Sequence, residues 1–249
     1  MIPNVLDIAG TPAPDQDEEF DMTITTSRIT AAAGLCAAVA GAIYIGVQVN
    51  HPTADVAHVV TTDVLVREMA KAGMAVLALT GFAGMFLRNR QRFGALGVVG
   101  YLLVSIGYFA MFANQCIVAC VLPVVARTSP GYVQDYLDAA MGNKPAGDIG
   151  HMADLFLVTG IGYSIGGLLF GIALFRAGIL ARWASALFAA GTVSALALAF
   201  LPESFSRPFA VPVGIALIGL GLSLYRTSRT ETASAPAAQV AAAEPAAVR

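Results

Sequence analysis

Residues 93–126 read FGALGVVGYLLVSIGYFAMFANQCIVACVLPVVA, a run without a single Asp, Glu, Lys, Arg or His. As an α-helix it would extend about 50 Å, well beyond the roughly 30 Å of hydrocarbon in a bilayer. Because lipid offers no hydrogen-bond partner to an open strand, the run predicts a membrane-spanning helix. Asn114 and Gln115 lie about 20 residues into it, where the helix should leave the hydrocarbon. We expect the remainder to project outward or to bend near Pro123.

Five further apolar stretches surround this run. The 249 residues are 57% hydrophobic and 12% charged, with a mean hydropathy of +0.73; soluble domains carry about twice that charge. The predicted fold class is therefore all-α, a polytopic membrane bundle of six transmembrane helices with a small outer cap and an amphipathic surface helix. The six stretches are 29–49, 72–87, 93–126, 155–175, 183–201 and 208–225. The shortest, 72–87, can be completed by Arg67 to Lys71 if their side chains snorkel to the interface.

The two ends of the chain differ from the bundle in composition. Residues 1–27 contain six Asp and Glu but no Lys or Arg, the opposite of a signal-peptide n-region. Residues 227–249 are small and polar, with little to bury. We expect disordered cytoplasmic tails at 1–27 and 227–249 around a six-helix transmembrane domain at 28–226.

The positions of the basic residues predict the orientation. If the N-terminus is inside, nine of the 14 Lys and Arg residues fall on the cytoplasmic side. We therefore expect a multi-pass protein of the cell (plasma) membrane with both termini in the cytoplasm. The anchors of this topology are Arg88, Arg90, Arg92, Arg176, Arg182 and Trp183. Since topology explains the basic RNRQR turn, we expect no nucleic-acid partner.

The outer cap is predicted from three segments. Valines at three- and four-residue spacing in 54–66 predict an amphipathic helix on the outer surface. It should pack against 116–126 and 132–141. The outer polar cluster comprises Asn50, Asn114, Gln115, Cys116 and Cys120. Thiols four residues apart on a regular helix are poorly aimed for a disulfide, so we expect structural thiols unless the helix is broken there.

The three histidines are all predicted on the outer side. His51 and His58 are seven residues apart, while His151 and Asp154 are three apart, so each pair would share a helix face. Imidazole and carboxylate ligands suit Zn, Cu, Fe or Ni, which makes an outer-face metal or haem protein one hypothesis. The chain has no HExxH or CxxC motif. A structural role for the scattered histidines is therefore favoured, and the cofactor is unknown.

Small residues predict where helices approach each other closely. Ala33, Ala37 and Gly41 recur at four-residue spacing, and the pairs 162/166 and 167/171 are glycines. In lipid, such residues allow tight helix packing. The pattern suits contacts within the bundle, and the alternative is a face for a homo-oligomer.

The segment HMADLFLVTGIGYSIGGLLFGIALFRAGILARWASAL, from His151 to Leu187, carries a resemblance. With the DVLVREMAKAGM segment, where Lys71 and Gly73 match a basic residue and a glycine, it resembles a large family of bacterial six-helix membrane proteins. The family is a domain of unknown function, the four-three-eight-six family. The resemblance covers about 28–225 and implies six helices but no substrate. A carboxylate associated with the family's second helix has no counterpart in 75–79.

The expected function follows mainly from what the apolar stretches lack. No Asp, Glu, Lys or Arg interrupts them, and the chain has no Walker or nucleotide-binding motif, which disfavours a pump or a proton-coupled transporter. We expect a non-catalytic membrane protein that binds a lipid, a lipophilic small molecule or a partner membrane protein at its outer face. The first alternative is the metal or haem protein, an oxidoreductase using the three histidines. The second is a facilitator of a neutral solute.

Overall fold

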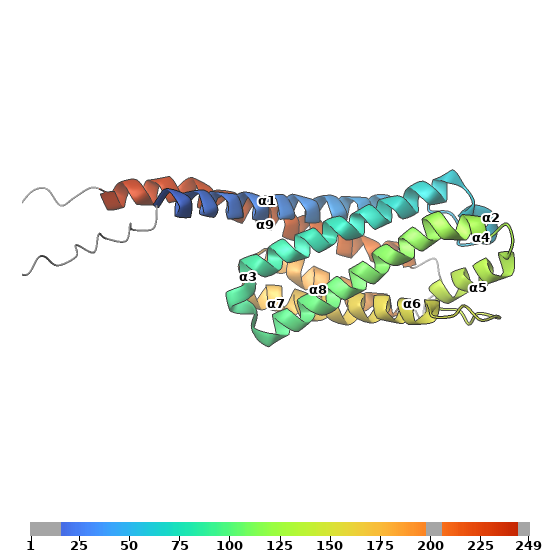
Figure 1. Ribbon diagram of the computed structural model, residues 1–249. Coiled ribbons are helices and arrows are strands. Elements are labelled where there is room, and N and C mark those ends of the chain that lie inside the picture. The colour runs from blue at the N-terminus through green and yellow to red at the C-terminus, as the bar shows by residue number, and fades with distance from the viewer. Residues whose placement is uncertain (1–15, 198–205, 244–249) are drawn as a thin grey trace, which may run out of the picture.

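The computed structural model describes residues 16–197 and 206–243, with side chains for 26–194 and 210–230. These residues form helices, turns and bends without a β-strand, so the predicted all-α class is confirmed (Figure 1). The helices are α1 (Gln16–Gly46), α2 (Val56–Val59), α3 (Thr62–Cys116), the π-helix η1 (Ile117–Val121), α4 (Leu122–Val125), α5 (Pro130–Ala140), α6 (Met152–Ile161), the π-helix η2 (Gly162–Gly166), α7 (Gly167–Ala177), α8 (Arg182–Ala197) and α9 (Ser206–Ala243).

Helix α3 reverses direction at Gly94. This residue has φ 56° and ψ −164°, a conformation that is essentially restricted to glycine. The rings of Phe82 and Tyr108 are 4.9 Å apart between centroids, although a straight helix would separate their positions by about 39 Å. The helix therefore consists of two antiparallel arms, 62–93 and 95–116, as Figure 1 shows.

Aromatic rings fill the centre of the bundle. The ring of Phe82 on the first arm of α3 lies within 6 Å of the rings of Tyr108, Phe170 and Phe188. All four side chains are fully buried. Because they come from both arms of α3, from α7 and from α8, these contacts join four segments in one core.

The small residues of α1 pack inside the molecule. Ala33 and Ala37 lie against Gly84 and Gly81 of α3, and Gly41 lies against the backbone of α9, where a Cβ would overlap. These contacts confirm the predicted use of small residues as helix seams within the bundle.

The glycines of the fourth apolar stretch, 155–175, pack against two neighbouring helices. Gly162 and Gly166 lie against the second arm of α3, while Gly167 and Gly171 lie against α8. The small faces of η2 and α7 are thus occupied by helices of the same chain, as the spacing predicted.

Within the described residues, four helical segments are long and apolar enough to cross a membrane. They are Thr26–Gly46, Thr62–Val125, Met152–Ala177 and Ala210–Thr230. The second contains both arms of α3. Part of the predicted stretch 183–201 and part of the predicted tails lie outside the described residues. Helix α9 continues to Ala243, beyond the predicted boundary at 226; the tails stay predictions.

One end of the molecule is closed by a small cap, made of residues 47–61 and 117–151. Its core consists of buried apolar side chains from α2, α3, η1, α4 and α5, with α6 packed against it. This is the predicted packing of 116–126 with 54–66 and 132–141. The helix departs from regular α-geometry there, because Ile117–Val121 form the π-helix η1. We name this end the cap end, and the opposite end, with Gly94 and the α7–α8 turn, the turn end.

The predicted amphipathic helix over 54–66 is wrong, because two caps divide it. The side chain of Asp55 accepts a hydrogen bond from the His58 backbone and begins α2, whereas Thr61 caps α3. Helix α2 is therefore only four residues long. Val59 is buried, but Val60 between the two helices is 53% exposed.

Candidate functional site

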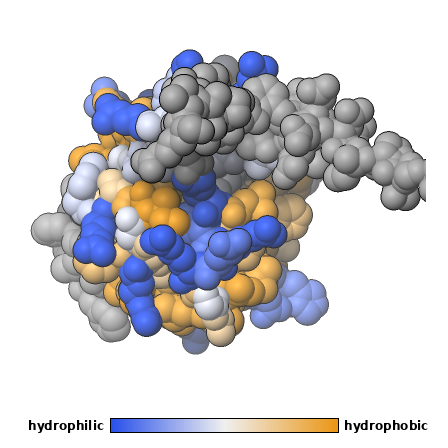
Figure 2. Space-filling view, turned by 90° about the vertical axis from the view of Figure 1, so that its left-hand side faces the viewer, coloured by the Kyte–Doolittle hydropathy of each residue, from blue (hydrophilic) through white to orange (hydrophobic). Residues whose placement is uncertain are grey.

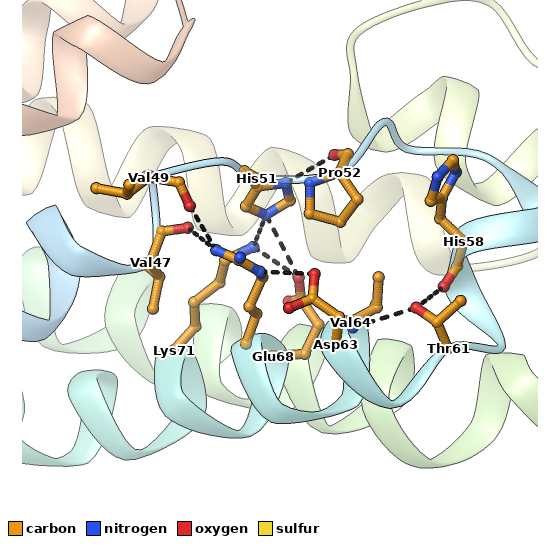
Figure 3. A network of polar contacts seen from close by, with 11 residues as sticks. Val47, Val49, His51, Pro52, His58, Thr61, Asp63, Val64, Glu68 and Lys71 are labelled. Atoms are coloured by element: carbon orange, nitrogen blue, oxygen red, sulfur yellow. Dashed lines mark hydrogen bonds and ion pairs between the residues drawn. The ribbon is translucent and has the colours of Figure 1, made fainter.

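A buried ionic network lies beneath the cap, centred on Glu68. This residue lies two turns into α3, and it is only 5% exposed. The Lys71 ammonium donates to Glu68 Oε1 at 2.6 Å and to His51 Nε2 at 2.8 Å, as Figure 3 shows. The expectation that Lys71 snorkels to the interface stays a prediction, and the structure shows which groups its ammonium binds. Its side chain points into the network, because the carboxylate one helical turn away holds its charge.

His51 takes part in this network as a neutral acceptor. Its Nδ1 lies 2.8 Å from the Pro52 carbonyl oxygen, which can only accept, so Nδ1 carries the proton. Nε2 is then free to accept from Lys71. A metal ion that used this nitrogen would have to displace the ammonium.

Arg67 connects the end of α1 to α3. Its guanidinium donates to the carbonyl oxygens of Val47 at 3.2 Å and Val49 at 2.8 Å, and to Asp63 at 2.9 Å. Carbonyls just past a helix end have no partner within the helix, and a guanidinium satisfies them. Arg67 and Lys71, one helical turn apart, thus both bind the segment that follows α1.

Tyr136 connects the cap to the end of α3 by a hydrogen bond. This fully buried residue of α5 donates its hydroxyl to Asn114 Oδ1, at the end of α3. Burial, helped by the nearby Tyr132 and Glu68, raises the pKa of the Tyr136 phenol above its usual value. The phenol therefore remains a hydrogen-bond donor. Asn114, predicted at the membrane interface, marks the junction between bundle and cap.

A layer of tyrosines lies deeper in the bundle. Tyr44 and Tyr163 share a hydrogen bond of 3.2 Å, and the rings of Tyr108 and Tyr163 are 5.8 Å apart. Tyr108 precedes Asn114 by six positions, which places it about 9 Å further in. Its buried hydroxyl finds no hydrogen-bond partner among the described residues. Polar groups thus extend from the cap towards the aromatic core.

The other two histidines form separate local pairs. His58 Nδ1 lies 2.8 Å from Asp55, and His151 Nδ1 lies 2.9 Å from Asp154. Hydrogen bonds from Thr53 and then from the His58 backbone and ring lower the pKa of Asp55 to about 2. The hydrogen bond to Asp154, aided by that residue's charge, raises the pKa of His151.

The structure does not bring the four predicted metal ligands together, which are His51, His58, His151 and Asp154. Over the described ranges, no three His, Cys, Asp or Glu side chains form a group suited to a metal ion. Each imidazole instead contacts residues close to it in sequence or in the network. The metal site stays a prediction, and its expected ligands do not all lie close together in the structure.

The predicted outer polar cluster is dispersed. Asn114 is hydrogen-bonded to Tyr136 of the cap. Asn50 is exposed in a turn with φ 49°, and Gln115 is half-buried. Cys116 ends α3 and Cys120 lies in η1; both are free thiols, as is Cys36.

Charge separates the two ends of the molecule. The seven acidic residues with described side chains all belong to the cap end. At the turn end the described side chains include no acid but eight arginines: Arg28, Arg88, Arg90, Arg92, Arg176, Arg182, Arg226 and Arg229. Figure 2 looks at this end, where hydrophilic side chains gather between hydrophobic ones. Among the predicted anchors, Arg92 donates to the Ala177 carbonyl at 3.3 Å, Arg182 lies over the Phe175 ring, and Trp183 is exposed.

Sequence reasoning missed Glu68 and the tyrosine layer. Glu68 precedes the apolar stretch 72–87, so hydropathy alone does not place it inside the bundle. The signal available was its three-residue spacing to Lys71, which predicts an ion pair on one helix face. For the tyrosines no local pattern exists, since they come from α1, α3 and η2.

Comparison with known proteins gave no relative: no protein-family model, curated protein or solved structure matches the chain. The resemblance to the six-helix bacterial family thus remains an expectation from the residues alone.

Proposed function

We propose that the chain crosses the cell membrane six times, with both termini and the turn end in the cytoplasm. The reversal of α3 at Gly94 supports two crossings in the segment Thr62–Val125. Helix α8 has 16 apolar-rich residues before the described range ends. In this proposal it supplies the remaining crossing, which is the fifth along the chain. The eight arginines at the turn end favour its placement inside.

We infer further that this is a non-catalytic membrane protein whose outer cap binds a lipophilic partner. The observation that carries this proposal is a pair of exposed apolar side chains in η1 and α4, beyond the interface expected at Asn114. Val121 and Val124 are 48% and 65% exposed, and they are three residues apart on one continuous helical segment. Exposed apolar side chains grouped outside the hydrocarbon mark sites for lipids or proteins.

The ionic network supports a binding role for the cap. Glu68, Lys71 and His51 contact one another, and the cap's apolar core covers them. Buried charges paired in this way rarely add much stability, but they select one geometry. In this proposal they hold the loop after α1 in place, and so keep the exposed valines on a defined surface.

Photo-crosslinking from the cap tests the proposal. A photoreactive amino acid at Val124 should give a discrete adduct in intact membranes, either a single lipid or lipophilic species or one protein. The matched control is Phe109, equally exposed at 64% but in the second arm of α3, facing the bilayer. That position should label bulk phospholipid. The same phospholipid mixture at both positions would overturn the proposal.

A further inference from the structure

A pocket opens between α1 and α9 at the turn end, far from the cap. Its volume is about 440 Å³. The two helices approach closely on either side of it, since the Ser27 hydroxyl donates to the Ser228 carbonyl at 2.6 Å and Gly34 lies against Gly221. The lining residues are Ser27, Arg28, Ala31, Ala32, Leu35, Tyr225 and Arg229.

Two arginines from different helices give the pocket its charge. Arg28 comes from α1 and Arg229 from α9, and none of the described residues that line the pocket is acidic. Arg229 donates to the Tyr225 hydroxyl at 2.8 Å, and its guanidinium lies 5.6 Å from the centre of that ring. The Tyr225 side chain thus holds one of the two charges at the pocket.

The remaining wall is apolar and leads towards the membrane interior. Ala31, Ala32 and Leu35 follow Arg28 along α1 in the direction of the cap end. Leu35 is exposed and belongs to the apolar segment Thr26–Gly46. A ligand that fits both parts carries a negative group at one end and a hydrocarbon chain at the other.

We propose that this pocket binds one anionic phospholipid from the leaflet at the turn end. Its phosphate lies between the Arg28 and Arg229 guanidinium groups, and an acyl chain runs along Ala32 and Leu35. Arginine forms paired, charge-assisted hydrogen bonds with phosphate oxygens, and basic pockets between membrane helices bind anionic headgroups. A free phosphate ion would leave the apolar wall unused. The site rests on the proposed membrane crossings, but it lies far from the cap, so its failure would leave the proposed partner of the cap untouched.

Native mass spectrometry of the full chain in mild detergent tests this site, with phosphatidylglycerol as the anionic probe and phosphatidylcholine as the zwitterionic one. Replacing both Arg28 and Arg229 by alanine should weaken phosphatidylglycerol binding roughly 30-fold, equivalent to about 2 kcal/mol for two basic side chains. The matched control replaces Arg176 and Arg226 by alanine. Both are exposed arginines of the turn end that do not line the pocket, so the same charge is lost and binding should hold.

A second variant tests the pocket itself while both charges remain. Ala32→Phe places a ring in the pocket from an exposed position of α1, so the fold should be kept, and the bound lipid should be lost. An unchanged elution volume in size-exclusion chromatography checks the fold. Equal losses in the two double variants, equal binding of phosphatidylcholine, or full displacement of the lipid by chain-free glycerol phosphate would each overturn the proposal.

Discussion

At position 68, replacing Glu by Ala would leave the half-buried Lys71 ammonium without its buried carboxylate partner. Breaking a buried ion pair in this way costs about 3–5 kcal/mol. We expect Glu68→Ala to lower the free energy of unfolding in detergent by that amount, measured by denaturant titration. Replacing both Glu68 and Lys71 by Met should recover much of the loss, because no unpaired charge remains.

The control for this prediction is Asp63→Ala, which removes the exposed partner of Arg67. Exposed ion pairs contribute only about 0–1 kcal/mol. If Glu68→Ala costs no more than Asp63→Ala, Glu68 is not the centre of a buried network.

His151 should titrate above the usual histidine pKa of about 6.5, because Asp154 stabilises its protonated form. The raised pKa means that the interaction is fully present below about pH 6.5 and is lost as the pH rises through the folded-state pKa. NMR titration of the imidazole should show the shift, and Asp154→Asn should return the midpoint towards 6.5. Because both side chains are exposed, we expect little effect on stability. An identical midpoint in the two proteins would contradict the assignment.

The reversal of α3 depends on one backbone conformation. A Cβ at Gly94 would meet no atom within 4 Å, so the cost of Gly94→Ala is conformational and amounts to about 1–3 kcal/mol of unfolding free energy. Gly73→Ala is the control, because that helical site in the first arm is equally open. It should be neutral or stabilise the helix by up to about 1 kcal/mol. Equal effects of the two changes in denaturant titration would show that the positive φ at Gly94 is not required.

At the same scale, some element boundaries were predictable and others were not. The apolar run 93–126 indicated a helix that leaves the membrane near Asn114 and then bends, because charge and hydropathy are visible along the chain. The π-helix η1, which interrupts the α-helix at Ile117–Val121, was not visible. The 54–66 segment failed because two side-chain caps, at Asp55 and Thr61, outweigh the valine spacing.

For the whole molecule, the six-crossing arrangement predicts which positions an impermeant maleimide reaches in a variant without the native cysteines. Asn143→Cys, exposed in the cap, should react in intact cells, whereas Gln91→Cys at the turn end should react only after permeabilisation. Glu203→Cys, outside the described residues, should react like position 143, because it follows the fifth crossing. Reaction of Gln91→Cys in intact cells would contradict the orientation. Protection of position 203 would contradict a crossing by α8.

The sequence by itself determined that the chain is helical, apolar enough for a membrane, and more basic on one side than on the other. Hydropathy and charge are sums over neighbouring residues, so they can be read without knowing any contact. Only the tertiary structure decided that Lys71 binds His51 and that the three histidines stay apart. It also decided that Arg28 and Arg229 line one pocket. Those facts depend on side chains that are distant in sequence, and folding alone places them together.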